Sequence, residues 1–188
     1  VHNTDSVMVV FKGLDKRETF DRGELYAERL TKEFKEPNEM EMEKIYNPYL
    51  LKGKKMYSGL CFTSKQAVIN YETYDQRPSE QIDALKKKLK EETDPTEAKK
   101  IDKQIKTLAP WPYVDTKGLT MVRRDNCAIV RDSSKKILNS LFERGDHSAN
   151  LDKAVTIACD TVQKVVDNKI PLEDYVITKS MKKDYSKA

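Results

Sequence analysis

The sequence predicts an α+β fold, in which an antiparallel sheet with helices carries an inserted helical hairpin and is followed by more helices. Short runs of continuous or alternating apolar residues, typical of strands, dominate the first third of the 188 residues. Residues 76–108 consist almost entirely of helix-forming and charged residues, with helical periodicity on both sides of a proline. The final third again spaces its apolar residues at helical intervals.

The composition fits one domain, or one and a part, with few residues available for a core. Hydrophobic residues make up 38% of the chain and charged residues 35%, whereas about 25% charged residues is ordinary. The net charge of +4 permits nucleic acid as a partner without arguing for it. No apolar run approaches a membrane span, and the three cysteines are too far apart for a zinc ribbon or disulfide framework. We therefore expect an intracellular protein with no membrane contact.

The first third of the chain predicts several strands and one helix. Continuous apolar runs indicate buried strands, alternation indicates half-buried strands, and apolar residues three and four positions apart indicate the helix. The strands are expected over Ser6–Phe11, 40–46, 54–62 and 67–71, with a break at Asn47-Pro48, and the helix over 20–34.

Residues 76–108 predict an antiparallel helical hairpin between two strand-like segments. Asp94-Pro95 supplies an N-cap and a proline at the first helical position of its second helix. The apolar stripes of the two helices consist of Ile82, Leu85 and Leu89 and of Ile101, Ile105 and Leu108. The lysines of this hairpin could bind DNA, but its mixed charges favour a solvated surface.

Beyond the turn at Ala109–Pro112, the sequence predicts an extended segment over Val114–Arg124 and helices over 133–142 and 151–166. Asn150 is the expected N-cap of the last helix. The apolar residues that share one face of this helix, and that we expect to be buried, are Leu151, Val155, Ala158, Val162 and Val165.

Carboxylates near the predicted strands could bind a cation. Asp5 stands where a loop enters the first predicted strand, and Mg²⁺ prefers such oxygen ligands. Asp5 could equally cap a turn, and by spacing alone that is the simpler interpretation. Glu41 and Glu43 share one face of their predicted strand, where they could reach the same cation or only be solvated.

Two basic clusters could contact phosphates. Lys52, Lys54 and Lys55 lie beside Tyr57, which suits contact with a nucleic-acid backbone. Arg123 and Arg124 precede Asp125. The arginines could form a salt bridge with the Asp125 carboxylate, or they could be a second phosphate contact.

Five motifs in sequence order are far more specific than any one of them. They are T-D-S-V-M from Thr4, E-x-E-K-I-Y-x-P-Y-L-L from Glu41, K-K-x-Y-x-G-L from Lys54, K-G-L-x-x-V-R-R-D-N-C from Lys117 and V-I-T-K from Val176. Together they resemble the family-B DNA polymerases, and within them the replicative delta-type enzymes and their relatives in large DNA viruses. The resemblance covers nearly the whole chain except the insertion at 76–108. It implies a polymerase palm over residues 4–125 and the start of a thumb over 126–188.

The resemblance also implies roles for individual residues. Asp5 matches the second aspartate of the family's Y-G-D-T-D-S motif, a ligand of two catalytic Mg²⁺ ions. Glu43 matches a palm glutamate close to that metal site and is carried as a supporting residue. Lys54, Lys55 and Tyr57 match the K-K-R-Y motif that grips the primer end, with methionine in place of its arginine.

Arg123 and Arg124 match the palm-to-thumb motif near the primer strand. The implied function is a DNA-directed DNA polymerase that extends a primer by Mg²⁺-dependent nucleotidyl transfer in replication. Its expected partners are primer–template DNA and dNTPs, and a sliding-clamp processivity factor is a further expectation. In a virus the protein would work in the host nucleus or cytoplasm. The chain alone is expected to be inactive, because the other metal-binding aspartate and the nucleotide-binding helix lie outside it.

Val1-His2-Asn3 stands where the family has Tyr-Gly-Asp and resembles the C-terminal end of an intein. Asn3 would cyclise to cleave the following peptide bond, His2 would donate a proton, and the Thr4 hydroxyl would be the acceptor nucleophile. We therefore expect residues 1–3 to be an intein remnant. The alternative is an inactivated polymerase homologue in which Asn3 replaces the first aspartate.

A different class of function also stays open. The chain could be a noncatalytic nucleic-acid-binding or interaction module, with the helical hairpin as its contact surface and Asp5 as a turn cap.

Overall fold

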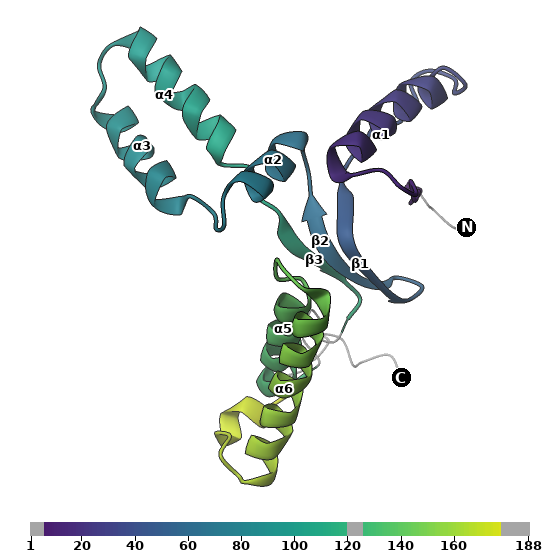
Figure 1. Cartoon of the computed structure of the whole chain (residues 1–188), viewed down its shortest axis with the longest axis vertical. Coiled ribbons are helices and arrows are strands. Elements are labelled where there is room, and N and C mark those ends of the chain that lie inside the picture. Colours follow the sequence, from purple (N-terminus) through teal and green to yellow (C-terminus); the bar gives the residue numbers. More distant parts are fainter. Residues whose placement is uncertain (1–5, 120–125, 178–188) are drawn as a thin grey trace, which may run out of the picture. The chain divides into compact units, whose positions relative to one another are not determined.

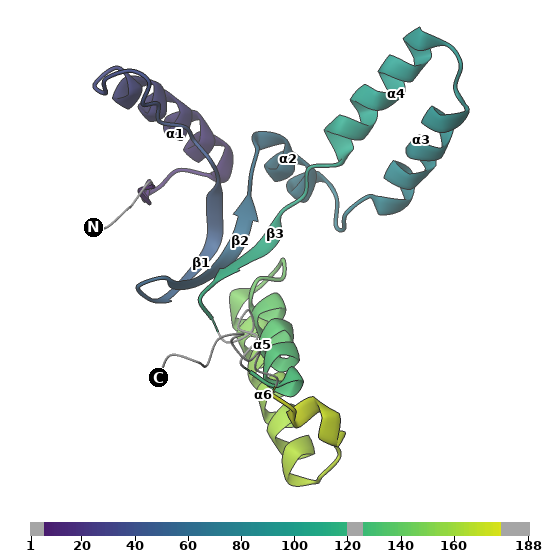
Figure 2. The ribbon, with the colours of Figure 1, turned by 180° about the vertical axis from the view of Figure 1, so that it is seen from behind.

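The computed structural model describes residues 6–119 and 126–177. It contains helices and a three-stranded antiparallel sheet, in which β2 lies between β1 and β3 (Figures 1 and 2). The mixed α and β composition predicted from the sequence is confirmed. The chain divides into two compact units, one of residues 1–47 and 61–113 and the other of residues 48–60 and 114–188.

The sheet consists of β1 (Ile45–Gly53), β2 (Met56–Phe62) and β3 (Tyr113–Lys117). The helices of the first unit are α1 (Lys16–Thr31), α2 (Lys65–Thr73), α3 (Ser79–Glu91) and α4 (Pro95–Leu108). Those of the second unit are α5 (Ala128–Leu141), α6 (His147–Val166) and the 3₁₀ helix η2 (Leu172–Tyr175). None of the helices in the described part of the chain has both the length and the apolar character needed to cross a bilayer.

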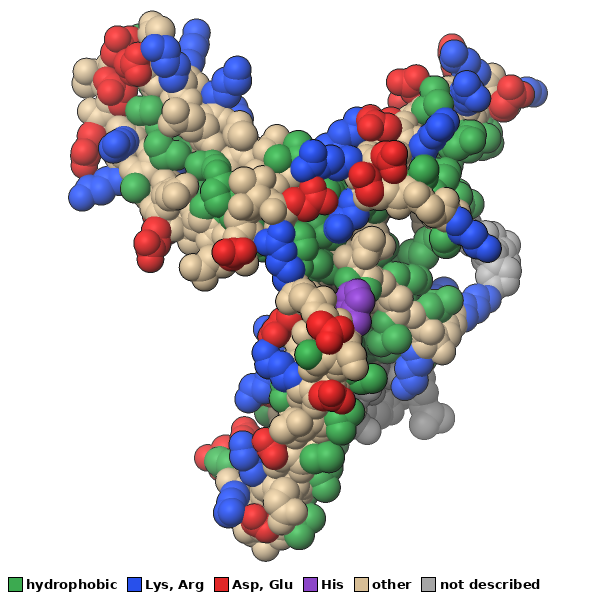
Figure 3. Space-filling view, in the orientation of Figure 1, with side chains coloured by type: hydrophobic (Ala, Val, Ile, Leu, Met, Phe, Trp, Pro, Cys, Tyr) green, Lys and Arg blue, Asp and Glu red, His purple; other side chains and the backbone are tan. Residues whose placement is uncertain are grey.

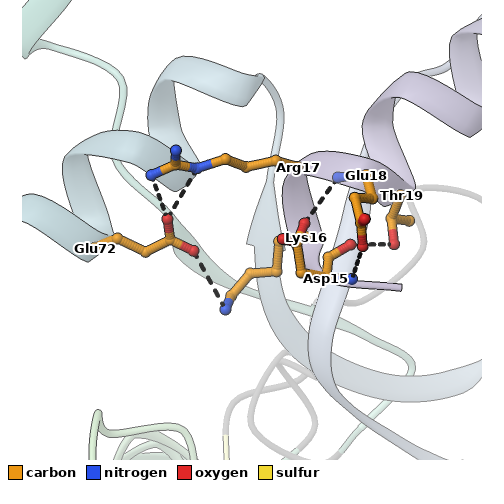
Figure 4. A network of polar contacts seen from close by, with 6 residues as sticks. All are labelled: Asp15, Lys16, Arg17, Glu18, Thr19 and Glu72. Carbon is orange, nitrogen blue, oxygen red and sulfur yellow. Dashed lines mark hydrogen bonds and ion pairs between the residues drawn. The ribbon is translucent and has the colours of Figure 1, made fainter. Parts of the chain in front are cut away.

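Polar contacts hold α1 against α2 (Figure 4). Asp15 and Glu18 form a capping box at the start of α1, in which each carboxylate accepts the backbone N–H of the other residue at 2.8–2.9 Å. Arg17 then donates two hydrogen bonds, of 3.0 and 2.6 Å, to one carboxylate oxygen of Glu72 on α2. Lys16 lies 3.8 Å from the other oxygen of Glu72. These exposed pairs fix the orientation of α1 on α2 but add little stability, because water screens them.

The strand predicted over residues 67–71 is wrong, because these residues lie in α2. The side chain of Ser64 accepts the backbone N–H of Ala67 at 3.2 Å and thereby caps the helix. Ala67, Val68 and Asn70 are buried. A short apolar run does not distinguish a strand from a buried helix, and here the N-cap identifies the helix.

The buried strand predicted over Ser6–Phe11 is also wrong. The segment is not a strand, and Val7 and Val10 are 67% and 83% exposed. A strand needs a neighbouring strand to pair its backbone groups, and the sheet of β1, β2 and β3 does not include this segment. Phe11 instead stacks on Tyr26 of α1, with ring centroids 5.8 Å apart.

The strand predicted over 40–46 begins only at Ile45, and β1 then continues through the expected break at Asn47-Pro48. A proline is tolerated there because β1 is an edge strand. The predicted alternation still holds, since Glu41 and Glu43 are exposed and Met42 is half-buried. Met42 lies directly on α1, where a Cβ added at Gly23 would come within 2.4 Å of its sulfur.

The helical hairpin is confirmed as α3 and α4. Asp94 caps α4 by accepting the backbone N–H of Thr96 at 2.8 Å. The amide of buried Asn70 on α2 donates to the carbonyl oxygens of Thr107, Leu108 and Pro110 at 2.8, 3.3 and 2.9 Å. The base of the hairpin is therefore hydrogen-bonded to α2.

Aromatic rings reinforce this attachment. Tyr71 of α2 contacts the ring of Phe62 at 5.5 Å and that of Trp111 at 5.7 Å between centroids, both edge to face. Trp111 lies shortly after the end of α4, beyond Ala109-Pro110, so the rings fix the point at which the hairpin returns.

In the second unit α5 and α6 pack side by side (Figures 1 and 2). The predicted N-cap at Asn150 is wrong, because α6 begins at His147, four residues before the predicted start, with Asp146 as its cap. Asp146 accepts the backbone N–H of Ser148 at 3.0 Å. Asn150 is buried and donates to the carbonyl oxygen of Glu143 at 2.7 Å, which holds α6 to the end of α5.

The face of α6 that was predicted to be buried is largely exposed. Leu151, Val155 and Val162 are 54%, 53% and 63% exposed, whereas Ala154 is only 3% exposed. Both sides of α6 carry apolar residues, so spacing along the helix identifies two possible faces. The neighbouring α5 selects the one that contains Ala154.

Candidate nucleic-acid interface

The connection between β1 and β2 presents two lysines to solvent. β1 ends at Gly53 and β2 begins at Met56, so that Lys54 and Lys55 make up the whole connection, here called the basic turn. Lys55 has a φ of +61°, the left-handed conformation that tight hairpin connections often require. Both lysines are exposed. The cluster that the sequence predicted therefore exists as a surface feature.

Gly118 brings the end of β3 against this turn. Its φ is +65°, and a Cβ added there would lie 2.1 Å from the carbonyl oxygen of Lys55. Only glycine allows the two backbones to approach so closely. Lys117 directly precedes Gly118 and is exposed, with its amine 3.7 Å from the carboxylate of Asp115. The interface thereby gains a third lysine.

Lys117 and Gly118 were not among the residues predicted for this surface. Their signal was the K-G-L at the start of the fourth motif, where a glycine directly follows a lysine. The meaning of this glycine becomes clear only when the backbone of Lys55 is known to lie against it.

An aromatic pair lies beside the basic turn. The rings of Tyr57 on β2 and Tyr49 on β1 are 5.6 Å apart and tilted by 45°. Burial, and to a lesser extent the charge that Tyr57 can acquire, raise the pKa of Tyr49. A tyrosine is neutral at physiological pH even without this shift, so the pair presents uncharged rings beside the lysines.

Beneath this surface β2 is joined to β3. The hydroxyl of Ser58 is fully buried and donates to the carbonyl oxygen of Asp115 at 3.2 Å. It also shares a 2.8 Å hydrogen bond with the hydroxyl of Thr116. Tyr57 precedes Ser58, so these bonds fix the strand from which the tyrosine projects.

Glu43 lies outside any metal-binding cluster of the described residues. Its side chain is 71% exposed and pairs with the amine of Lys44 at 3.1 Å. Across residues 6–119 and 126–177, no group of three His, Cys, Asp or Glu side chains could hold a metal ion. The described residues therefore do not fit a Mg²⁺ site by themselves.

Several predicted site residues lie outside the described ranges, and their roles stay predictions. These are the candidate metal ligand Asp5, the primer contacts Arg123 and Arg124, and the splice-junction residues His2, Asn3 and Thr4.

Comparison with known proteins supplies a family match. The model of DNA polymerase family B matches residues 3–73 and 101–188 and leaves residues 74–100 unmatched. The unmatched residues include all of α3 and the first part of α4. The insertion inferred from the sequence thus coincides largely with the part of the chain that the family model leaves out.

Curated relatives align along almost the whole chain. It is 34% identical over 185 residues to the DNA polymerase delta catalytic subunit of Candida albicans, covering 98% of this chain and 13% of the relative. It is 32% identical over 188 residues to the DNA polymerase of Paramecium bursaria Chlorella virus NY2A, covering 97% and 15%. The delta catalytic subunit of Plasmodium falciparum is 30% identical over 184 residues, covering 97% and 12%. The chain therefore spans only 12–15% of the length of these relatives.

Proposed function

The chain belongs to DNA polymerase family B, and we propose that it is part of a DNA-directed DNA polymerase that extends a primer by Mg²⁺-dependent nucleotidyl transfer in DNA replication. The observation that carries the proposal is the match to the family on both sides of the inserted hairpin. The names of the delta-type and viral relatives favour a replicative role. Under this proposal residues 4–125 belong to the palm and residues 126–188 begin the thumb.

The basic turn is proposed to contact the backbone of primer–template DNA. Lys54, Lys55 and Lys117 are exposed, and Lys117 directly precedes Gly118, which lies against the backbone of Lys55. Lysine amines bind phosphates without regard to base sequence, as an enzyme that copies any template requires. The ring of Tyr57 supplies the uncharged surface beside them.

Asp5 is proposed as a ligand of the catalytic Mg²⁺ ions, with Glu43 nearby and the remaining ligands supplied by other parts of the polymerase. Bound Mg²⁺ would stabilise the negative charge that develops on the transferred phosphoryl group. Asp5 itself would supply a carboxylate oxygen as a ligand to the metal. The dNTP substrates and a sliding-clamp partner belong to the same proposal for the whole protein.

Duplex binding by this chain tests the role of the basic turn. Fluorescence anisotropy with a labelled primer–template duplex gives the binding constant between 50 and 200 mM NaCl. Replacing Lys54 and Lys55 by glutamine should make the negative slope of log K against log salt less steep by about 2, because each phosphate contact contributes roughly 0.9 to its magnitude. The control is K87Q/K88Q on α3, which removes the same charge from exposed adjacent lysines. Equal slopes for both variants would contradict the proposed contact.

Primer extension by the full-length enzyme tests the role of Asp5. Asp5→Asn should reduce the rate of dNTP incorporation by several orders of magnitude and leave duplex binding intact, because the amide no longer supplies a charged metal ligand. A noncatalytic module, in which Asp5 only caps a turn, predicts an unchanged rate.

The splice-junction interpretation of His2, Asn3 and Thr4 stays a prediction that upstream sequence can test. An open frame that gives intein sequence, and before it a polymerase segment ending in Tyr-Gly-Asp, would support it. Polymerase sequence running without interruption into Val1 would favour the homologue in which Asn3 replaces an aspartate.

A further inference from the structure

The outward face of α4 carries lysines and no carboxylate. Successive residues of a helix are turned by about 100°, which places one group of residues opposite the apolar stripe of Ile101, Ile105 and Leu108. That group consists of Lys99, Lys100, Lys103, Lys106, Thr96 and Thr107, all of them exposed. We call its four lysines the lysine face of α4.

The acidic residues of α4 lie at the edges of this face. Glu97 pairs with Lys100 and Asp102 pairs with Lys106, each at 2.6 Å. The two central lysines of the face are Lys99 and Lys103, and neither forms an ion pair with the part of the chain that the structure describes. A shallow depression of about 480 Å³ adjoins Lys103 but not Lys99, and it is lined by Lys100, Lys103, Gln104, Thr107 and Leu108.

The other helix of the hairpin is different. The outward face of α3 mixes charges of both signs, namely Glu80, Asp83, Lys87, Lys90 and Glu91. In Figure 3 blue side chains project along the outer edge of the hairpin over α4, while red side chains gather at its tip and on the α3 side. Both helices carry four lysines, but only on α4 do they share one face that has no carboxylate.

The chemistry of the lysine face suits phosphates better than protein. It contains no aromatic or large apolar side chain, and lysine is depleted in the cores of protein interfaces. Lys99 and Lys106 are separated by about 10 Å along the helix. Phosphates of one DNA strand recur about every 3.4 Å along the duplex, so this face can span about three of them.

We propose that the lysine face of α4 is a further, sequence-independent contact for the phosphate backbone of duplex DNA. The inference rests on the proposed polymerase function and adds a contact on a helix whose first part, with Lys99 and Lys100, belongs to the unmatched residues 74–100. The hydrogen bonds of Asn70 and the contact of Tyr71 with Trp111 hold the base of the hairpin, so the face is presented on an anchored helix.

The test compares three double variants of this 188-residue chain by the anisotropy titration described above. K99Q/K103Q should weaken duplex binding about tenfold or more at 0.1 M NaCl. It should also make the negative slope of log K against log salt less steep by about 2. K87Q/K90Q removes the same charge from α3 and should change neither. Circular dichroism checks that both variants keep their helices, and K99R/K103R should bind like the parent chain because it keeps both charges.

The outcomes separate this inference from the proposed function. If K99Q/K103Q behaves like K87Q/K90Q while K54Q/K55Q loses affinity, the lysine face does not bind DNA and the proposed function stands. If the reverse holds, the lysine face is confirmed and the basic turn is not a contact. Polyglutamate that binds the parent chain more tightly than the duplex at equal ionic strength would overturn the inference in favour of an acidic protein partner.

Discussion

At the scale of single residues, Gly118 determines how the end of β3 meets the basic turn. Its left-handed φ and the 2.1 Å separation between its hypothetical Cβ and the Lys55 oxygen leave no room for a side chain. Gly53, at the other side of the turn, has no atom within 4 Å of such a Cβ. Two glycines close together in the fold therefore differ completely in their tolerance of substitution.

Gly118→Ala should destabilise the chain by roughly 2–4 kcal/mol, because it combines backbone strain with a backbone clash. Urea unfolding followed by circular dichroism measures this change. The same variant should weaken duplex binding by moving the turn that holds Lys54 and Lys55. Gly53→Ala is the matched control and should change stability by less than about 1 kcal/mol. Equal stabilities for the two variants would contradict the close approach.

At the scale of elements, Asn70 connects α2 to the helical hairpin. Its buried amide satisfies carbonyl oxygens at the end of α4 that have no partner within the helix. The lysine face depends on this attachment, because α4 is positioned by its base. The hairpin is thus an attached part of the first unit, although the family model does not match all of it.

Asn70→Ala should cost about 1–3 kcal/mol, since it leaves buried carbonyl oxygens unsatisfied. Hydrogen exchange should accelerate most in the last turn of α4. Asn139→Ala, at an exposed position of α5, is the control and should stay within about 0.5 kcal/mol of the parent chain. Unchanged exchange in α4 would show that Asn70 does not anchor the hairpin.

The second element-scale prediction concerns the two apolar faces of α6. Val155→Lys should leave the free energy of unfolding within about 0.5–1 kcal/mol, because this side chain is 53% exposed. Ala154→Lys should cost about 3 kcal/mol or more, because position 154 is only 3% exposed and packs within the α5–α6 pair. A comparison of thermal unfolding curves distinguishes them. The opposite order of stabilities would mean that the face predicted from the sequence is the buried one.

At the scale of the whole molecule, the described part of the chain carries the basic turn, for which DNA contact is proposed, but no group of side chains there could hold a metal ion. It also spans only 12–15% of the length of the relatives that it matches. Its low apolar content is consistent with both facts. The charged hairpin adds polar residues, and stretches such as Val7–Val10 and the outer face of α6 leave apolar side chains exposed.

The purified chain should therefore bind duplex DNA weakly and in a salt-dependent way, and it should incorporate no dNTP. Primer extension on a labelled template, with Mg²⁺ present, measures incorporation, and a complete family-B polymerase serves as the positive control. Incorporation by the chain alone that Asp5→Asn abolishes would mean that the catalytic site is complete without other parts of the polymerase.

Local signals in the sequence determined the elements whose stability is itself local. The apolar stripes of α3 and α4, with Asp94-Pro95 between them, predict the hairpin without any distant contact. The exposure of Lys54 and Lys55 could likewise be predicted, because they form the turn between adjacent strands, whereas their contact with DNA stays a prediction.

Tertiary structure alone decided the features that depend on distant neighbours. Whether Val7–Val10 forms a strand depends on a pairing partner, and which face of α6 is buried depends on α5. The importance of Gly118 depends on the carbonyl oxygen of Lys55, a residue more than sixty positions away in the chain. Propensity and periodicity report the preferences of a segment, whereas burial and backbone approach depend on what the rest of the chain places beside it.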